Sequence, residues 1–132
     1  MIQLEKSKVE NQIATKIIDA AFEVYTELGP GLLESVYSYC LARELKLLGL
    51  KVQSELELPI HYKDEKLKQF YKVDLLVNER VIIELKATET FHEVHYAQLL
   101  TYLKLSKIKL GILINFNTAY LKSGVKRVVN GL

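Results

Sequence analysis

The sequence predicts an α/β fold in which helices flank a mixed β-sheet, and three observations lead to this prediction. Apolar residues recur at helical spacing up to residue 48, and they alternate with polar residues or form continuous runs from residue 52 to residue 87. Helical spacing returns near residues 93–105, and apolar segments at 110–116 and 119–129 follow. The expected order is therefore α-α-β-β-β-α-β-β, within a single domain over residues 1–132.

Two helices are expected before the first strand. The first ends at Gly29, after which Pro30-Gly31 turns the chain, and the second ends at Gly49. Their apolar faces are formed by Ile13, Ile17, Ala20, Ala21, Val24 and Leu28, and by Leu33, Val36, Tyr37, Cys40, Leu41, Leu45 and Leu48.

The first strand is expected at 52–62, because its even positions are apolar and its odd positions are mostly polar. Pro59 interrupts this segment, and proline cannot donate a hydrogen bond to a neighbouring strand, so the strand should lie at an edge or carry a bulge. The apolar even positions are Val52, Leu56, Leu58, Ile60 and Tyr62.

The next two apolar segments form a hairpin that contains a polar constellation. Asp74 interrupts residues 70–77, and Glu84 and Lys86 interrupt residues 81–87. Carboxylates among branched aliphatic residues are costly to desolvate unless they pair or hold a metal. Their placement predicts a site for metal-dependent phosphodiester cleavage.

The loop length decides whether these residues meet. A three-residue loop, Asn78-Glu79-Arg80, sets Asp74 opposite Glu84 and Lys72 opposite Lys86. A two-residue loop would send Glu84 to the other face of the sheet. The chemistry therefore predicts the three-residue loop, and Asn78 tolerates the left-handed conformation that such a loop often needs.

The residue types suit a hard divalent cation. Opposed residues of paired strands have Cα atoms about 4.5–5.5 Å apart, so two carboxylates there can share one or two ions of Mg²⁺ or Mn²⁺. The metal would lower the pKa of a bound water, and Lys86 would orient that water or stabilise developing charge.

A surface charge cluster is the alternative interpretation of the hairpin. Asp74, Glu84, Lys72 and Lys86 could form cross-strand pairs that contribute little to stability. Glu-x-Lys by itself is a weak signal, because Glu44-Leu45-Lys46 has the same form within a helical segment.

A second element favours the nuclease interpretation. Gly31-Leu32-Leu33-Glu34-Ser35-Val36-Tyr37 reads Gly-x-x-Glu-x-x-Tyr, ahead of Asp74 and the Glu84-Leu85-Lys86 segment. Together with the segments 95–103 and 110–116, these motifs resemble the GxxExxY protein family of the PD-(D/E)xK nuclease superfamily. The resemblance covers roughly residues 14–129 and implies a restriction-endonuclease-like core. Val73 stands where the superfamily name has a proline.

This resemblance implies roles for particular residues. Asp74 and Glu84 correspond to the metal carboxylates, Lys86 to the catalytic lysine, and Glu34 to a helical acid near the metal or its waters. Three converging acids repel one another in the absence of a metal, so at least one should have a raised pKa, which Lys86 should partly offset.

The helix expected near 93–105 supplies candidate substrate contacts. Gln98 and Tyr102 match the Gln-x-x-x-Tyr pattern of the exonuclease-like branch of the superfamily. They are four residues apart and share one helical face, and His95 lies beside them. Tyr102 could equally be a partly buried aromatic residue whose hydroxyl is satisfied.

Composition sets the remaining expectations. The only cysteine, Cys40, excludes an intramolecular disulfide, and no apolar run reaches the length of a membrane span, so a cytoplasmic protein without a membrane partner is expected. Residues 104–132 carry six basic and no acidic side chains, whereas residues 1–103 carry 12 basic and 16 acidic ones. A basic end segment beside an acidic metal site suits a nucleic acid as partner.

The function expected from these features is divalent-metal-dependent cleavage of nucleic acid, with DNA as the favoured substrate. A homodimer would suit a small domain with one site, which can cut one strand per engagement. Two alternatives remain at this point: a catalytically silent nucleic-acid-binding module, and a protein-interaction accessory domain on the same fold.

Overall fold

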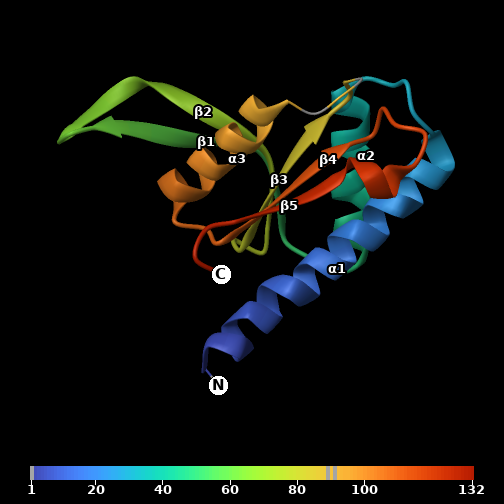
Figure 1. Cartoon of the computed structure of the whole chain (residues 1–132), viewed down its shortest axis with the longest axis horizontal. Helices are drawn as coiled ribbons and strands as arrows, with labels where there is room; N and C mark the ends of the chain where they lie inside the picture. Colours follow the sequence, from blue (N-terminus) through green and yellow to red (C-terminus); the bar gives the residue numbers. More distant parts are fainter. Residues whose placement is uncertain (1, 89, 91) are drawn as a thin grey trace.

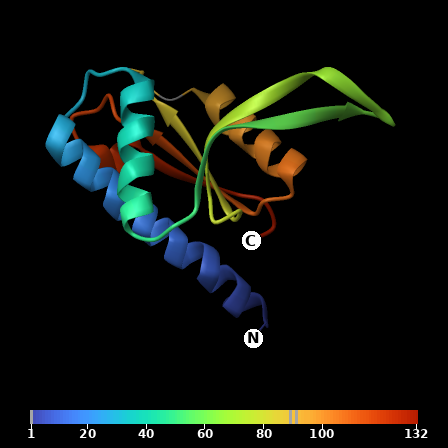
Figure 2. The same ribbon diagram turned by 180° about the vertical axis from the view of Figure 1, so that it is seen from behind.

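Helices cover both faces of a five-stranded sheet in the computed structural model, which describes residues 2–88, 90 and 92–132 (Figures 1 and 2). The elements are α1 (Ile2–Leu28), α2 (Glu34–Leu47), β1 (Val52–Tyr62), β2 (Glu65–Val77), β3 (Val81–Lys86), α3 (Glu93–Ser106), β4 (Leu110–Asn115), the 3₁₀ turn η1 (Leu121–Gly124) and β5 (Val125–Val129). This order confirms the predicted α/β fold. Among the described residues, no helix has the length and apolarity to cross a membrane.

The sheet is mixed, as predicted. Its strands follow one another in chain order, and of their pairs β3–β4 is the parallel one. The connection through α3 returns the chain to the end of the sheet where β3 begins, so β4 runs in the same direction as β3. β1 lies at one edge, which accommodates Pro59.

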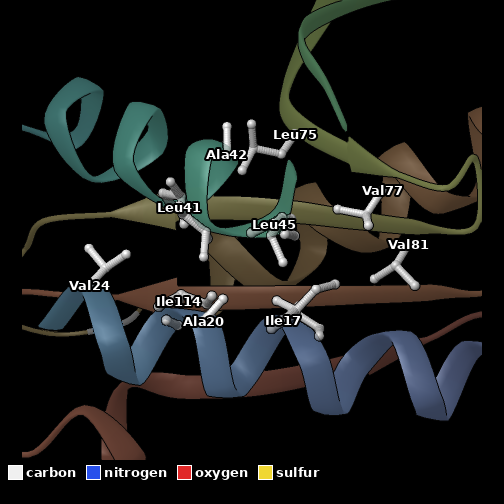
Figure 3. Packing of buried hydrophobic residues seen from close by; sticks show 14 of the residues in the cluster. Ile17, Ala20, Val24, Leu41, Ala42, Leu45, Leu75, Val77, Val81 and Ile114 are labelled. Atoms are coloured by element: carbon white, nitrogen blue, oxygen red, sulfur yellow. The ribbon is translucent and has the colours of Figure 1, made fainter. Parts of the chain in front are cut away.

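Two apolar clusters hold the helices on the sheet. One cluster joins α1 and α2 to one face, where Ile17, Leu41 and Leu45 pack on Val81 and Ile114 (Figure 3). The other joins Leu99 and Leu103 of α3 to the opposite face. The helix periodicity therefore identified most of the buried positions. Four predicted positions at or near the helix ends are exposed: Leu28, Leu33, Val36 and Leu48.

The strand expected at 119–129 is shorter than predicted. Residues 121–124 form the 3₁₀ turn η1, and the strand begins at Val125. A Cβ atom at Gly124 would lie 2.3 Å from the backbone oxygen of Asn115, so the chain passes too close to β4 at this point for any other residue.

The loop between β2 and β3 has the predicted three residues, since Val77 pairs with Val81. Asn78 and Glu79 both have positive φ angles, of 51° and 55°. Asn78 also exchanges hydrogen bonds with the backbone of Lys51, donating from its N–H and accepting at Oδ1, each at 2.8 Å. These contacts fix the register on which the site depends.

β1 and β2 continue beyond the sheet as a two-stranded ribbon. The pairing of β2 with β3 ends at Leu75 and Ile83, whereas its pairing with β1 continues to Glu65 and Tyr62. In Figures 1 and 2 this green ribbon projects away from the body of the molecule.

The ribbon changes its packing face where it leaves the sheet. Val52 packs with the α1–α2 cluster, but Leu56 packs with the α3 cluster, and between them Glu55 has a φ of 50°. The even positions of β1 therefore do not share one face along the whole strand, as alternation alone had predicted. Leu75 and Val73 of β2 divide between the two clusters in the same way.

Candidate active site

Asp74 and Glu84 meet where β2 and β3 separate. The backbone N–H of Asp74 donates to Glu84 Oε1 at 3.1 Å, and the backbone N–H of Leu85 donates to Asp74 Oδ2 at 2.8 Å. Two side-chain hydrogen bonds therefore continue the pairing that ends at Leu75 and Ile83. The predicted register is confirmed, because it sets Asp74 opposite Glu84.

Burial gives both carboxyl groups unusual acidities. Glu84 is only 5% exposed, and desolvation, with the nearby charge of Asp74, raises its pKa to about 8. Desolvation also raises the pKa of Asp74, against the opposing effect of the hydrogen bond from Leu85. Each carboxylate accepts a backbone hydrogen bond from the strand that carries the other, so the two groups lie close together. This burial argues against the solvated surface cluster, in which neither group would be desolvated.

Lys86 is the cation whose charge acts on both carboxyl groups. It follows Glu84 by two residues on the same strand, so both side chains leave the same face of the sheet. It is half-buried, and its charge lowers the pKa of both carboxyl groups, as predicted. Lys72 was expected opposite Lys86, but it lies in the ribbon and pairs with Glu57 instead.

Glu34 approaches the pair from the start of α2. Its Oε1 accepts the backbone N–H of Ala87 at 3.1 Å, and its charge raises the pKa of Asp74. Glu34 and Asp74 line one side of a pocket of about 410 Å³. The other residues that line this pocket are Ser35, Ser38, Tyr39, Ser54 and Glu55. Nothing in the sequence pattern distinguished Glu55, because its place opposite Asp74 arises from the pairing of β1 with β2.

Tyr37 explains the spacing of the Gly-x-x-Glu-x-x-Tyr motif. Its ring is fully buried and stacks on Phe116, with ring centroids 4.3 Å apart. Its hydroxyl donates to the oxygen of Gly29 at 2.6 Å and accepts the backbone N–H of Leu32 at 3.1 Å. The tyrosine therefore holds the turn before α2, and this turn sets the position of Glu34.

Replacing Tyr37 by phenylalanine should keep the ring stacking but remove both hydrogen bonds. We expect the free energy of unfolding to fall by about 1–3 kcal/mol, because two partly buried hydrogen bonds to the backbone are lost. Urea denaturation measures this change. Tyr39→Phe is the matched control, since Tyr39 is 69% exposed, and equal losses in the two variants would contradict the anchoring role.

The face of α3 that carries Gln98 and Tyr102 points toward the carboxylate pair. Tyr102 is 5% exposed, and burial together with the charges of Glu84 and Asp74 raises its pKa to about 12. Gln98 is half-buried one turn earlier on the same helix.

His95 lies at the same end of α3. Its Nδ1 accepts the backbone N–H of His92 at 3.2 Å, so this contact helps to cap the helix. Burial and then the charge of Lys86 lower the pKa of His95, while the charge of Glu34 raises it. The structure thus brings His95 close to two of the predicted site residues.

Asn115 is a site residue that the sequence analysis missed. It is 4% exposed at the end of β4, and its side chain accepts the N–H of Thr88 at 3.1 Å and donates to the oxygen of Thr88 at 2.7 Å. It therefore fixes the chain directly after Lys86. A polar residue at the end of an otherwise apolar strand was the available signal.

Two lysines of the basic end segment, Lys107 and Lys109, lie away from the site. β3 and β4 are parallel, and Val81 pairs with Leu110 while Lys86 pairs with Asn115. Lys107 and Lys109 precede β4, so they lie at the end of the sheet opposite Lys86. The sequence expectation was wrong for these lysines, because sequence position does not show which end of a strand faces the site.

A divalent cation fits the carboxylate pair. Mg²⁺ needs only one or two protein carboxylates and completes its shell with water and phosphate oxygens. Asp74 and Glu84 each use one oxygen for a backbone hydrogen bond. Their pKa values are raised first by desolvation and then by neighbouring carboxylate charge, and a bound cation would oppose both effects. Within the described part of the chain, no group of three or more His, Cys, Asp or Glu side chains is arranged to hold a metal, so a role for Glu34 there is not shown.

Comparison with known families places this site in a wider group. A family model described as the PD-(D/E)XK nuclease superfamily matches residues 11–128. The match includes the carboxylate pair, the lysine and the helical glutamate, and nucleases of this superfamily generally use divalent metal ions. In the same comparisons no curated protein and no solved structure matches. By its fold, its site and this match, the chain belongs to the PD-(D/E)XK nuclease superfamily.

Proposed function

We propose that this protein is a divalent-metal-dependent nuclease that hydrolyses phosphodiester bonds in DNA. The observation that supports this most directly is the buried pair formed by Asp74 and Glu84, with Lys86 on the same strand face. A buried acid pair lowers stability, and proteins accept such a cost at functional sites. Holding a cation is a function that would account for this pair.

Each residue has a proposed role. Asp74 and Glu84 hold Mg²⁺ or Mn²⁺, with Glu34 bound to the ion or to its waters. The bound ion would supply a water of lowered pKa and neutralise phosphate charge. Lys86 orients the attacking water or stabilises the charge that develops on the phosphate. Gln98, Tyr102 and His95 contact the substrate beside this centre.

The proposal extends to the family within the superfamily, the oligomeric state and the cellular compartment. The buried Tyr37 and the placement of Glu34 support assignment to the GxxExxY family within the superfamily. A homodimer would let two sites act on opposite strands of a duplex. The single free thiol of Cys40 is consistent with the reducing cytoplasm.

The purified protein tests this function directly. Labelled single-stranded, duplex and branched DNA, and the corresponding RNA, are incubated with Mg²⁺, with Mn²⁺ or with a chelator. We expect cleavage of DNA that requires a metal and stops on chelation. The Asp74→Asn variant, purified in parallel, reveals any contaminating nuclease, and cleavage that is the same in both preparations would refute the proposal.

A further inference from the structure

The projecting ribbon of β1 and β2 contributes Asp74 and Glu55 at its base to the site described above, and the rest of the ribbon has no role there. Beyond Leu75, β2 has no partner strand except β1, and the ribbon reaches its turn at Lys63 and Asp64. The free end extends well past α3 in both ribbon views (Figures 1 and 2).

One face of the ribbon is used to pack against α3. Leu58 and Val73 are buried in the α3 cluster, and Tyr71 lies against Tyr102, with ring centroids 5.2 Å apart. These residues share one face, because Leu58 pairs with Tyr71 and side chains alternate along each strand.

The opposite face carries a row of lysines that leads to the site. Phe70 and Lys72 lie on this face, because their partners Pro59 and Glu57 alternate with Leu58. The pairing shifts register between Pro59 and His61, but Lys66 and Lys68 line one pocket together with Phe70, Glu57 and Pro59, so they face the same side. Asp74, the next even position, lies where the ribbon changes its packing face.

In order toward the site, these even positions of β2 are Lys66, Lys68, Phe70, Lys72 and Asp74. At about 3.3 Å per residue, the row extends at most about 26 Å from Asp74. We name these four residues, Lys66, Lys68, Phe70 and Lys72, the lysine row.

The outer half of the lysine row is positively charged and accessible. Lys66 and Lys68 are exposed, and neither lies in an ion pair with any carboxylate of the described residues. Lys66 pairs across the ribbon with His61, and Phe70 is 46% exposed opposite Pro59. Lys72, nearer the site, pairs with Glu57. The positive charge is therefore concentrated away from the acids of the site.

We propose that the lysine row is a binding surface for the phosphate backbone of the nucleic acid that enters the site. Same-face residues about 6–7 Å apart present their charges to successive parts of a polyanion. A two-stranded ribbon is also narrow enough to enter the DNA major groove, about 12 Å wide. This inference rests on the proposed function, because the row ends at its metal carboxylate.

The test compares two variants that each lose two lysines. Lys66→Ala/Lys68→Ala removes the outer lysine row, and Lys107→Ala/Lys109→Ala removes the same charge at the opposite end of the sheet. Fluorescence anisotropy measures binding of labelled duplex and single-stranded oligonucleotides in chelator, over a series of salt concentrations. Urea denaturation checks that both variants keep the stability of the wild type.

The expected result is a weaker salt dependence of oligonucleotide binding in the Lys66→Ala/Lys68→Ala variant. The slope of log K against log [salt] should become shallower by about 1.8 for duplex, or about 1.4 for a single strand, in the Lys66→Ala/Lys68→Ala variant. The control variant should keep the wild-type slope.

Equal slopes in the two variants would overturn the role of the lysine row and leave the nuclease proposal standing. Wild-type protein that binds neither oligonucleotide would also overturn it. Row-dependent binding without any metal-dependent cleavage would refute the nuclease proposal alone.

Discussion

Replacing Lys86 by methionine is expected to lower metal-dependent cleavage by about two orders of magnitude or more, the scale of losing one group that stabilises the transition state. Methionine keeps an aliphatic side chain but removes the charge. Binding of Mn²⁺ should survive, because Asp74 and Glu84 remain. Single-turnover cleavage and calorimetric titration with Mn²⁺ measure the two effects separately.

The helical segment Glu44-Leu45-Lys46 provides a matched control for this substitution. Lys46→Met makes the same chemical change within a Glu-x-Lys sequence that lies on α2, so its cleavage rate should equal that of the wild type. Asp74→Asn should abolish metal binding and cleavage together while oligonucleotide affinity is retained. Undiminished cleavage by the Lys86→Met protein would assign the activity to a contaminant or to a different site.

A second large effect, on the pH dependence of the free energy of unfolding, is expected from Glu84→Gln in the metal-free protein. The pKa of Glu84 is about 8 in the folded protein and has an ordinary value of 4.5, so the folded state holds this proton more tightly than the unfolded state. Below about pH 4.5 both states are protonated and the stability is fully present. As pH rises toward about 8, the unfolded state ionises first, and the free energy of unfolding falls by roughly 3–5 kcal/mol.

Glutamine cannot ionise, so Glu84→Gln should remove most of this fall and exceed the wild type in stability above pH 8. Urea denaturation across pH 5–9 in chelator measures the effect. Saturating Mn²⁺ should restore the stability of the wild type at high pH but not that of the variant, because the cation binds the ionised pair.

Glu79→Gln is the control for the pH profile. Glu79 is exposed in the loop, and its hydrogen bond and ion pair with Lys51 lower its pKa. Its contribution to stability is therefore present above its ordinary pKa of 4.5 and is lost only as pH falls. Removing it should leave the fall between pH 5 and pH 8 unchanged. A wild-type profile that is flat over this range would contradict the buried acid pair.

The pairing of Asp74 with Glu84 can be predicted from the sequence. Side chains alternate with a period of two along a strand, so the choice of a three-residue loop at Asn78–Arg80 fixes every facing pair up to the site. Helical periodicity likewise identified the buried faces of α1 and α2, because local repeats are read directly from the chain. The Gly-x-x-Glu-x-x-Tyr motif pointed to Glu34 through its resemblance to a known family rather than through periodicity.

Only the tertiary structure decided where this alternation stops. At Glu55 and Asp74 the ribbon leaves the sheet and changes its packing face. Lys72 therefore pairs with Glu57 on β1 and does not pair with Lys86 on β3. This change depends on the packing of the ribbon against α3, and a local pattern carries no information about such contacts.

The surroundings of the site were also decided by tertiary structure. Asn115 reaches Thr88 because β3 and β4 are parallel neighbours. Tyr102 acquires its raised pKa because the packing of α3 on the sheet buries it near Glu84. Lys109 lies at the far end of the sheet for the same topological reason. Residues distant in sequence meet through strand order and helix packing, whereas sequence periodicity determines only which face each residue occupies within its own element.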